Sequence, residues 1–483
     1  MNFFVNEAMG IGNSGVEHAQ FYRAKRFEQA NLPYKFVFME LVENLHEAMD
    51  KWHIREDKVL NMWEYFVLGD SYAKNGVKTL VNPVSETVID STNTNRLINS
   101  VTASNLRIVK HVVKYPNPDK EGQLLVSVNR IELFNGTVKK VSYETLVNPH
   151  GGSSVIQNVH LFRQPGSEHL FFRNDVQLRR YFFQQIDRIF GVDSTFIIDR
   201  SEDTQVALMT DTTNPKRRLV NVVHADHLAD RNDPKNPLWN NYYEYVLTHL
   251  NLVDRLVVAT KLQREDLLID FPDAKAKITA IPVGGVSDKK TKNTKKDFGT
   301  PFKLVTISRL ASEKHIDLII RAVIKLQNDG HRVTLDVYGA GGEQGKLADL
   351  IKNNHAEKYI ELKGLTHHAV EKYPKYDAFI SASYSEGFGL TYIEALNGGL
   401  PVVTFNARFG AQELIHDGEN GVSLPFKRDD EEYNVQELYN GILRLQSMDY
   451  PKLKQAVENS VTEFRNAKIA RSWEELINGL RNS

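Results

Sequence analysis

The sequence of 483 residues contains no cysteine. Disulfides, thiolate metal sites and a cysteine nucleophile are therefore excluded, and a reducing compartment is the natural setting. The sequence also lacks an apolar run of membrane-spanning length, and its first residues have neither the basic nor the apolar region of a signal peptide. We therefore expect a cytoplasmic protein that is stabilised by packing alone.

An excess of charge of one sign is also missing, since the formal net charge is -1 and 25% of the residues are charged. This balance is typical of ordinary globular proteins and argues against a nucleic-acid binder. One lysine-rich stretch, Asp288 to Lys296, allows at most a peripheral contact with an acidic membrane surface. A solvated linker between domains is the simpler interpretation.

The order of apolar runs and turn signals predicts an α/β protein with two or three domains. Residues 1 to 65 and 174 to 284 form one series of strands and helices, and residues 300 to 462 form a second. Both series are typical of Rossmann-like domains with parallel sheets, whose ligands bind beyond the carboxyl ends of the strands. We expect the two domains to face a cleft, and residues 463 to 483 to form a helix that packs back on the N-terminal domain.

Residues 66 to 173 interrupt the first series with a different pattern. Apolar and polar residues alternate there, and turn signals occur at Asn135-Gly136 and at Pro165-Gly166. This pattern predicts an antiparallel β insertion in the N-terminal domain.

A glycine-rich loop follows the first strand. The spacing of Gly10, Gly12 and Gly15 fits G-x-G-x-x-G, and Glu40 ends the next strand, where a dinucleotide-binding protein has its ribose-binding acid. An NAD-dependent oxidoreductase is therefore one alternative. The glycines themselves indicate only that backbone N–H groups approach a phosphate or another polar ligand closely. A second glycine-rich stretch, Gly339 to Lys346, does not have the spacing of a P-loop.

A set of cations, glycines and carboxylates follows the strand ends of the second series. Arg309 and Lys314 supply fixed positive charge for a diphosphate leaving group. Gly387 to Gly389 are expected to open a helix whose N–H groups point at a phosphate or a sugar hydroxyl. We expect Glu386 and Glu394, about two turns apart, to line one side of the same pocket, where carboxylates accept hydrogen bonds from hydroxyls.

The E-x7-E pattern with G-F-G-L inside it, preceded by S-R-x3-E-K, resembles the retaining, GT-B-fold glycosyltransferases of family 4 over about residues 300 to 425. The resemblance implies that Glu386 contacts the donor sugar and that Glu394 contacts the nucleotide ribose. It also implies that His224 lies near the reacting sugar and that Gly12 or Gly15 approaches the phosphates. The predicted catalytic residues are Glu386, His224, Arg309 and Lys314, and the predicted donor-binding residues are Gly12, Gly15, Ser308, Arg309, Lys314, Tyr338, Gly339, Leu365, Glu386, Gly387, Phe388, Gly389, Leu390 and Glu394.

Two segments of the first half, residues 10 to 23 and 238 to 245, together with the β insertion, resemble bacterial enzymes that glycosylate serine-rich repeat adhesins. The resemblance implies transfer of glucose or N-acetylglucosamine from UDP-glucose or UDP-N-acetylglucosamine to a serine-rich acceptor protein or to sugar already on it. A homologous partner subunit and a homo-oligomer are further expectations. Wall teichoic acid glycosyltransferases share a comparable insertion and are one alternative. The resemblance to both groups implies that the insertion, residues 66 to 173, serves acceptor binding or oligomerisation. A non-catalytic substrate-recognition subunit is another alternative.

No metal or other cofactor is expected. The sequence has no D-x-D, the motif with which the other main glycosyltransferase fold holds its metal. His224 and His227 are three residues apart, but no third ligand for zinc presents itself. The role of Glu17, near the glycine-rich loop, stays open, and the aromatic stretch Trp239 to Tyr245 is interpreted as packing.

Overall fold

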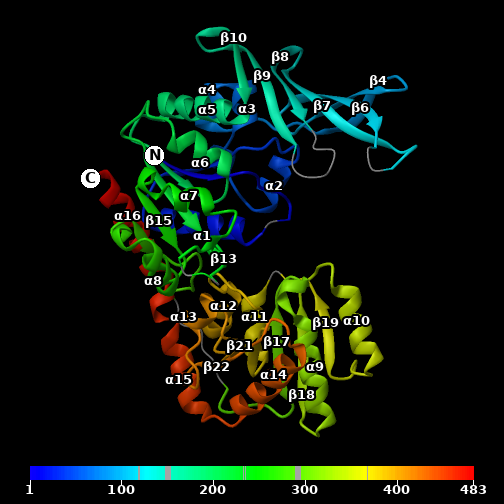
Figure 1. Ribbon diagram of the computed structural model, residues 1–483, viewed down its shortest axis with the longest axis vertical. Helices are drawn as coiled ribbons and strands as arrows, with labels where there is room; N and C mark the ends of the chain where they lie inside the picture. Colours follow the sequence, from blue (N-terminus) through cyan, green and yellow to red (C-terminus); the bar gives the residue numbers. More distant parts are fainter. Residues whose placement is uncertain are drawn as a thin grey trace. The chain divides into compact units, whose positions relative to one another are not determined.

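The computed structural model describes residues 1–12, 14–117, 120–146, 154–231, 233, 235–288, 295–366 and 368–482. Most of the lysine-rich stretch therefore lies outside the described residues. The chain divides into two compact units, which are described separately below (Figure 1). Unit 1 consists of Met1–Val222, Asn241–Leu256 and Ile477–Ser483, and unit 2 of Val223–Asn240 and Val257–Leu476. The domain boundaries expected from the sequence stay predictions.

The first parallel sheet has the strand order β16-β15-β12-β11-β1-β2-β3. Every residue of β1 and β2 is buried, as is usual for strands of a parallel sheet that helices cover on both faces. Its strands are β1 (Asn2–Asn6), β2 (Tyr34–Phe38), β3 (Val59–Asn61), β11 (Thr195–Ile198), β12 (Arg218–Val223), β15 (Arg255–Val258) and β16 (Ile278–Ala280). Because β2 and β11 pair with β1 on opposite sides, the topological switch point lies between β1 and β11.

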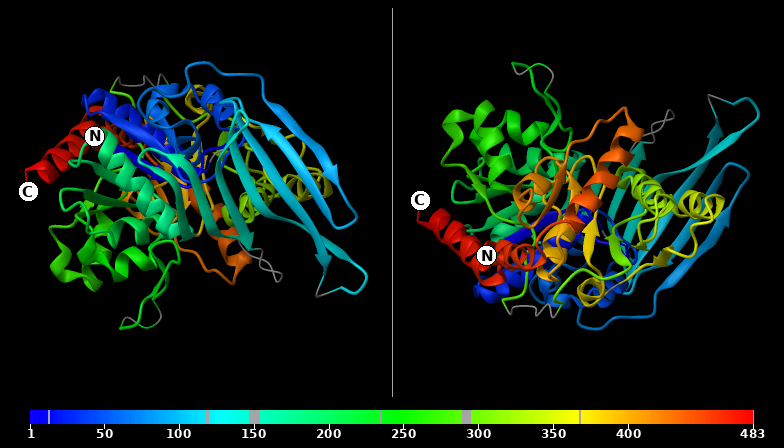
Figure 2. Two further views of the ribbon diagram at one scale, coloured as in Figure 1. Left: turned by 90° about the horizontal axis from the view of Figure 1, so that it is seen from above. Right: turned by 90° about the horizontal axis from the view of Figure 1, so that it is seen from below.

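The antiparallel insertion is present as a seven-stranded sheet with the order β10-β9-β8-β7-β6-β5-β4. Figure 2 shows its long strands side by side, in blue to teal. The inner face is apolar, with Leu133, Val141 and Leu161 fully buried, and Tyr143 stacks on Trp63 at 4.5 Å between ring centroids. The strands are β4 (Val84–Ser91), β5 (Asn95–Val101), β6 (Leu106–Pro116), β7 (Leu124–Asn135), β8 (Val138–Leu146), β9 (Val155–Gln164) and β10 (Ser167–Asn174).

Both hairpins expected from the sequence are confirmed, since β7 pairs with β8 and β9 pairs with β10. The turns contain Gly136 (φ +59°) and Gly166 (φ +80°), a backbone conformation that favours glycine. The alternating pattern therefore identified the insertion correctly.

The parallel sheet of unit 2 has the order β19-β18-β17-β20-β21-β22. Its strands are β17 (Phe302–Ile307), β18 (Val333–Tyr338), β19 (Ile360–Gly364), β20 (Ala378–Ile380), β21 (Val402–Phe405) and β22 (Gly421–Leu424). The sequence did not predict β22, which is short and begins at a glycine. Helix α9 (Ile316–Asn328) carries a wide apolar face that packs on β18 and on helix α14 (Glu431–Gln446).

Further helices complete the two units. They are α1 (Gly15–Gln29), α2 (Leu45–Lys51), α3 (Met62–Leu68), α4 (Asp70–Asn75), α5 (Asp175–Phe190), α6 (Glu202–Met209), α7 (Glu244–Thr248), α8 (Lys261–Asp270), α10 (Gln344–Asn353), α11 (Ala369–Lys372), α12 (Leu390–Asn397), α13 (Gly410–Leu414), α15 (Tyr450–Ser460) and α16 (Asn466–Arg481). The end of α16 belongs to unit 1, where Leu480 O accepts a hydrogen bond from Arg218 Nε at 3.0 Å. Across the described residues, no helix is both long and apolar enough to cross a membrane.

Candidate functional site

The main chain of Glu386 is fixed by a short segment that follows β21. Glu386 N donates to Arg408 O at 2.9 Å, and Phe409 N and Gly410 N donate to Glu386 O at 2.7 and 2.8 Å. A Cβ atom at Gly410 would lie 2.0 Å from Phe388 O, so only glycine permits this approach. The segment 408–410 therefore sets the position of the Glu386 backbone.

Helix α12 begins at Leu390 with Gly389 as its N-cap. The expectation that Gly387 to Gly389 open this helix therefore holds for Gly389 and is wrong for Gly387. Gly389 precedes the helix with φ +83°, a left-handed conformation that a continuing helix does not contain. Glu386 thus lies in the loop before the helix, whereas Glu394 lies within it. The two carboxylates do not share a helix face, and the argument that placed them on one side of a pocket does not hold.

Lys314 and Glu386 form an ion pair, with 2.5 Å between Nζ and Oε1. Their side chains are 20% and 18% exposed, so water screens this pair less than it screens surface charges. Arg309, the other predicted cation, is 71% exposed and pairs with Glu313 at 2.7 Å. Of the two cations, Lys314 is the one that contacts the predicted sugar-binding carboxylate.

The ends of β17 and β18 come together at the next predicted residues. Ser308 N donates to Tyr338 O at 3.1 Å. Gly339 has φ +147°, and a Cβ atom there would lie 1.9 Å from Ser308 O, so this position requires glycine. Ser308, Tyr338 and Gly339 therefore lie together at the carboxyl ends of β17 and β18.

Glu394 is half-buried, and burial raises the pKa of its carboxyl above the ordinary value. The Tyr373 hydroxyl donates to Oε2 at 3.3 Å and offsets this effect only in part. The charged form of such a carboxylate gains from further hydrogen-bond donors, such as the hydroxyls of a ribose. Among the other predicted residues of unit 2, Phe388 is buried, Leu390 is half-buried and Leu365 is 65% exposed.

The segment that contains His224 lies directly against the Glu386 loop. A Cβ atom at Gly387 would be 2.4 Å from His224 O and 3.0 Å from Ala225 Cα. Both segments belong to unit 2. The structure therefore brings His224, Gly387, Glu386 and Lys314 together.

Arg408 and Phe409, which the sequence did not indicate, also contact the segment that contains His224. Arg408 donates to Asp226 at 3.3 Å, and the Phe409 ring stacks on His227 with 5.6 Å between centroids and 12° between planes. The segment 408–410 thus contacts the Glu386 loop on one side and the His224 segment on the other. The available signal was its place directly after β21, at the carboxyl edge of the sheet.

His227 packs in the interior of unit 2. Its side chain is fully buried, and Nε2 lies 3.3 Å from an Asp266 carboxylate oxygen. Within the described ranges, no three His, Cys, Asp or Glu side chains are placed to hold a metal ion. The metal-free reaction stays a prediction.

In unit 1 the glycine-rich loop is open. Gly12 and Gly15 are exposed, and a Cβ atom at either would have no neighbour within 4 Å. Ser14 caps α1, and Glu17 completes the capping box by accepting from Ser14 N at 2.7 Å and from Asn6 Nδ2 at 3.0 Å. Glu17, whose role the sequence left open, therefore stabilises the start of α1.

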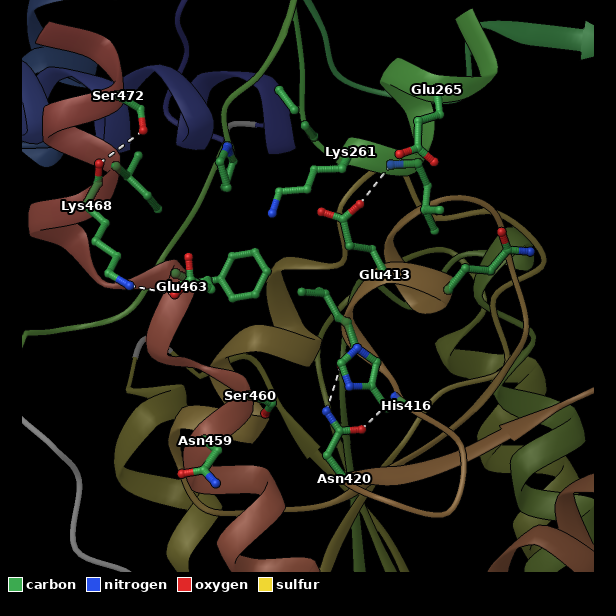
Figure 3. A pocket seen from close by; sticks show the side chains of 18 of the residues that line it. Lys261, Glu265, Glu413, His416, Asn420, Asn459, Ser460, Glu463, Lys468 and Ser472 are labelled. Atoms are coloured by element: carbon green, nitrogen blue, oxygen red, sulfur yellow. Dashed lines mark hydrogen bonds and ion pairs between the residues drawn. The ribbon is translucent and has the colours of Figure 1, made fainter. Parts of the chain in front are cut away.

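Unit 2 also contains a cavity of about 1010 Å³ between α8, α13, α15 and α16 (Figure 3). Glu413 accepts from Leu262 N at 2.9 Å on one wall, and Lys468 pairs with Glu463 at 2.6 Å on another. None of the residues predicted for the donor site lines this cavity. Volume alone therefore does not identify the functional site, and the chemistry at the Glu386 loop is the better guide.

Comparison with known proteins shows to which family the chain belongs. The model of the family described as glycosyl transferases group 1 matches residues 287–459. A UDP-N-acetylglucosamine–peptide N-acetylglucosaminyltransferase GtfA subunit from Limosilactobacillus reuteri is 31% identical, covering 99% of both chains. The chain belongs to the group 1 glycosyl transferases. A poly(ribitol-phosphate) alpha-N-acetylglucosaminyltransferase from Staphylococcus aureus is a more distant relative, 24% identical over 99% of both chains.

Two solved structures agree over the whole length. The pneumococcal O-GlcNAc transferase GtfA in complex with UDP and GlcNAc has a TM-score of 0.72 at 26% identity and covers 100% of this chain and 99% of its own. The GtfA/B complex gives a TM-score of 0.75 at 26% identity, with 100% of both chains covered. The predicted GT-B fold is thereby confirmed. For a group 1 glycosyltransferase, the oxidoreductase interpretation of Gly10 to Gly15 is excluded.

Proposed function

We propose that this glycosyltransferase transfers N-acetylglucosamine from UDP-N-acetylglucosamine to serine and threonine hydroxyls of a serine-rich protein. The observation that carries the proposal is the full-length similarity to the Limosilactobacillus reuteri GtfA subunit, whose name states this donor and a peptide acceptor. The ion pair of Lys314 with Glu386, in contact with the His224 segment, supplies the groups that such a donor needs.

The proposed reaction breaks the bond between the anomeric carbon and the phosphate oxygen of UDP. Lys314, joined by Arg309, stabilises the negative charge that collects on the diphosphate, and Glu386 accepts hydrogen bonds from the sugar hydroxyls. Glu394 accepts from the ribose. His224 lies at the reacting sugar, and the backbone at Gly12 and Gly15 approaches the phosphates.

We assign no carboxylate nucleophile. The acceptor hydroxyl attacks from the face that UDP leaves, its oxygen bonds to the anomeric carbon, and its proton passes to a phosphate oxygen. The anomeric configuration is retained, as in family 4, and no metal takes part. These details rest on the family resemblance.

We also propose that the chain acts in the cytoplasm together with a second, homologous subunit. The relative from Limosilactobacillus reuteri is named a subunit, and a GtfA/B complex has been solved. The β insertion, which the family resemblance linked to acceptor binding or assembly, is the proposed contact region.

A polyol-phosphate polymer is the second candidate acceptor. The poly(ribitol-phosphate) N-acetylglucosaminyltransferase of Staphylococcus aureus matches over the full length, although at lower identity. Both candidates use the same donor chemistry, so the acceptor has to be tested directly.

Mass spectrometry of the products distinguishes these candidates. The chain, alone and with its partner subunit, is incubated with UDP-N-acetylglucosamine or UDP-glucose and with either a serine-rich peptide or poly(ribitol phosphate). We expect N-acetylhexosamine on the peptide. Modification of the polymer alone would contradict the proposed acceptor. A hexose on the peptide, without N-acetylhexosamine, would show that the chain transfers glucose and not the proposed sugar.

A further inference from the structure

The aromatic stretch from Trp239 to Tyr245 contains one ring that is largely exposed. Trp239 stacks on Phe271 at 5.5 Å, and Tyr245 stacks on His249 at 4.4 Å. Tyr243 is 2% exposed. Tyr242, in contrast, is 61% exposed, which is unusual for a large aromatic side chain inside a folded segment.

An arginine covers this exposed ring. The Arg200 guanidinium carbon lies 4.5 Å from the centre of the Tyr242 ring, a cation–π contact within unit 1. Arg200 Nε is buried and has no hydrogen-bond partner. Within the described ranges, Arg200 forms no ion pair, so a ring and not a carboxylate lies against its charge.

Neighbouring arginines differ from Arg200 in this respect. Arg23 donates to both carboxylate oxygens of Asp199, at 3.0 and 2.5 Å. Arg179 donates to both carboxylate oxygens of Glu7, at 2.7 and 3.0 Å. Asp199 and Glu7 are thus engaged by these two arginines, whereas Arg200 lies over a ring.

The pair also lies where a parallel sheet binds ligands. Arg200 follows the carboxyl end of β11, next to β1, and this is the switch point of the first sheet. Tyr242 directly precedes α7, which packs against α6, and α6 starts two residues after Arg200 (Figure 1). Two separate segments therefore place the Arg200 guanidinium and the exposed Tyr242 ring at the carboxyl end of one sheet.

We propose that Arg200 and Tyr242 bind the main chain of the acceptor peptide, an inference that rests on the proposed function. A serine- and threonine-rich peptide has few large side chains, so its carbonyl oxygens and flat peptide groups are its main features for recognition. The planar guanidinium donates several hydrogen bonds in a fixed geometry to such oxygens. The Tyr242 ring supplies a rigid contact surface at low entropic cost.

The test compares the peptide and donor kinetics of four variants. Tyr242→Ala removes the ring, Tyr242→Phe keeps it, and Arg200→Gln removes the charge and most donors. Tyr433→Ala is the matched control, because Lys427 lies over the Tyr433 ring at 4.4 Å in unit 2. Each variant is assayed, with the partner subunit present, for transfer to a serine-rich peptide and for hydrolysis of UDP-N-acetylglucosamine without peptide.

We expect Tyr242→Ala and Arg200→Gln to raise the KM for peptide about tenfold, the size of effect common for tyrosine and arginine at interface centres. The KM for UDP-N-acetylglucosamine and the rate of donor hydrolysis should not change, and Tyr242→Phe and Tyr433→Ala should behave like the wild type.

Three results would overturn the inference. An unchanged KM for peptide in Tyr242→Ala and Arg200→Gln would show that these side chains do not bind the peptide, and it would leave the proposed function intact. A parallel loss of donor hydrolysis would show that the pair supports the fold or the donor site. Failure of the wild type to modify any peptide, with transfer to poly(ribitol phosphate), would contradict the proposed function and the inference together.

Discussion

The glycine-rich loop before α1 and the loop that contains Glu386 and Gly387 differ in how closely protein atoms surround them. At Gly387, beside Glu386, a Cβ atom would lie 2.4 Å from the backbone of His224, whereas at Gly12 it would meet nothing within 4 Å. The carboxylates differ too. Glu386 forms an ion pair with a lysine 72 positions away in the sequence, and Glu17 caps the helix in which it lies.

This difference separates two reasons for having a glycine. The Gly387 position is tightly enclosed by protein atoms, so its requirement can be seen without a ligand. The Gly12 position is open, so any requirement for glycine there has to come from a ligand or from the backbone. A G-x-G sequence occurs in both loops, but only at Gly387 do surrounding protein atoms explain why the residue is glycine.

The largest effect is expected for Glu386→Gln. Loss of the carboxylate removes an acceptor for the donor sugar and leaves Lys314 without its partner, so kcat/KM for transfer should fall on the order of 100-fold. Steady-state kinetics with UDP-N-acetylglucosamine measure this. Glu17→Gln is the matched control and should retain activity, because glutamine also completes a capping box. Undiminished turnover in Glu386→Gln would show that the site has been assigned incorrectly.

Gly387→Ala is expected to have the next largest effect. The added methyl group must push the loop away from His224, at a cost of about 1–3 kcal/mol for overpacking. We expect a lower free energy of unfolding in urea together with reduced transfer, because the same loop positions Glu386. A variant with wild-type stability and activity would mean that the two segments separate easily.

Much of the fold was accessible from the sequence because its signals are local. Apolar runs indicated the two series of strands and helices, and alternation around Asn135-Gly136 and Pro165-Gly166 identified the hairpin strands β7 to β10. Strand β22 was missed: its four residues begin at Gly421 and include Ser423, so they do not form an apolar run. The equally short β21, Val402–Phe405, was found because it lies in such a run.

The site was less accessible because its geometry depends on contacts between distant segments. The E-x7-E spacing drew attention to Glu386, but helical periodicity failed because Gly389 adopts a left-handed conformation before α12. Nothing in the local sequence showed that Arg408 would contact Asp226 or that Phe409 would stack on His227. Long-range packing decided these positions.

Ser14→Ala tests the stabilising role of the first loop. The substitution removes the capping hydroxyl of α1 and should lower the free energy of unfolding by about 1 kcal/mol. Urea unfolding measures the change. Donor hydrolysis by the folded variant should stay near the wild-type rate, and a selective loss of hydrolysis without destabilisation would point to a ligand contact at Ser14.

Acidification tests the other half of the capping box. Burial raises the pKa of Glu17, but hydrogen bonds from Ser14 and Asn6 outweigh it and hold the pKa below its ordinary value. The stabilisation is therefore present above the unfolded-state pKa, about 4.3, and is lost as the pH falls through the lower folded-state pKa. When the pH is lowered from about 5 to about 3, the free energy of unfolding of the wild type should fall by about 0.3 kcal/mol more than that of Glu17→Gln.

The smallest effect on stability is expected for Gly12→Ala. No protein atom lies within 4 Å of the added methyl group, so the free energy of unfolding should change by less than about 0.5 kcal/mol. The proposed approach of this loop to the phosphates predicts a rise in the KM for UDP-N-acetylglucosamine of up to about tenfold, or about 1.4 kcal/mol. A stable variant with an unchanged donor KM would remove Gly12 from the donor site and leave the second loop as the better-supported part of that site.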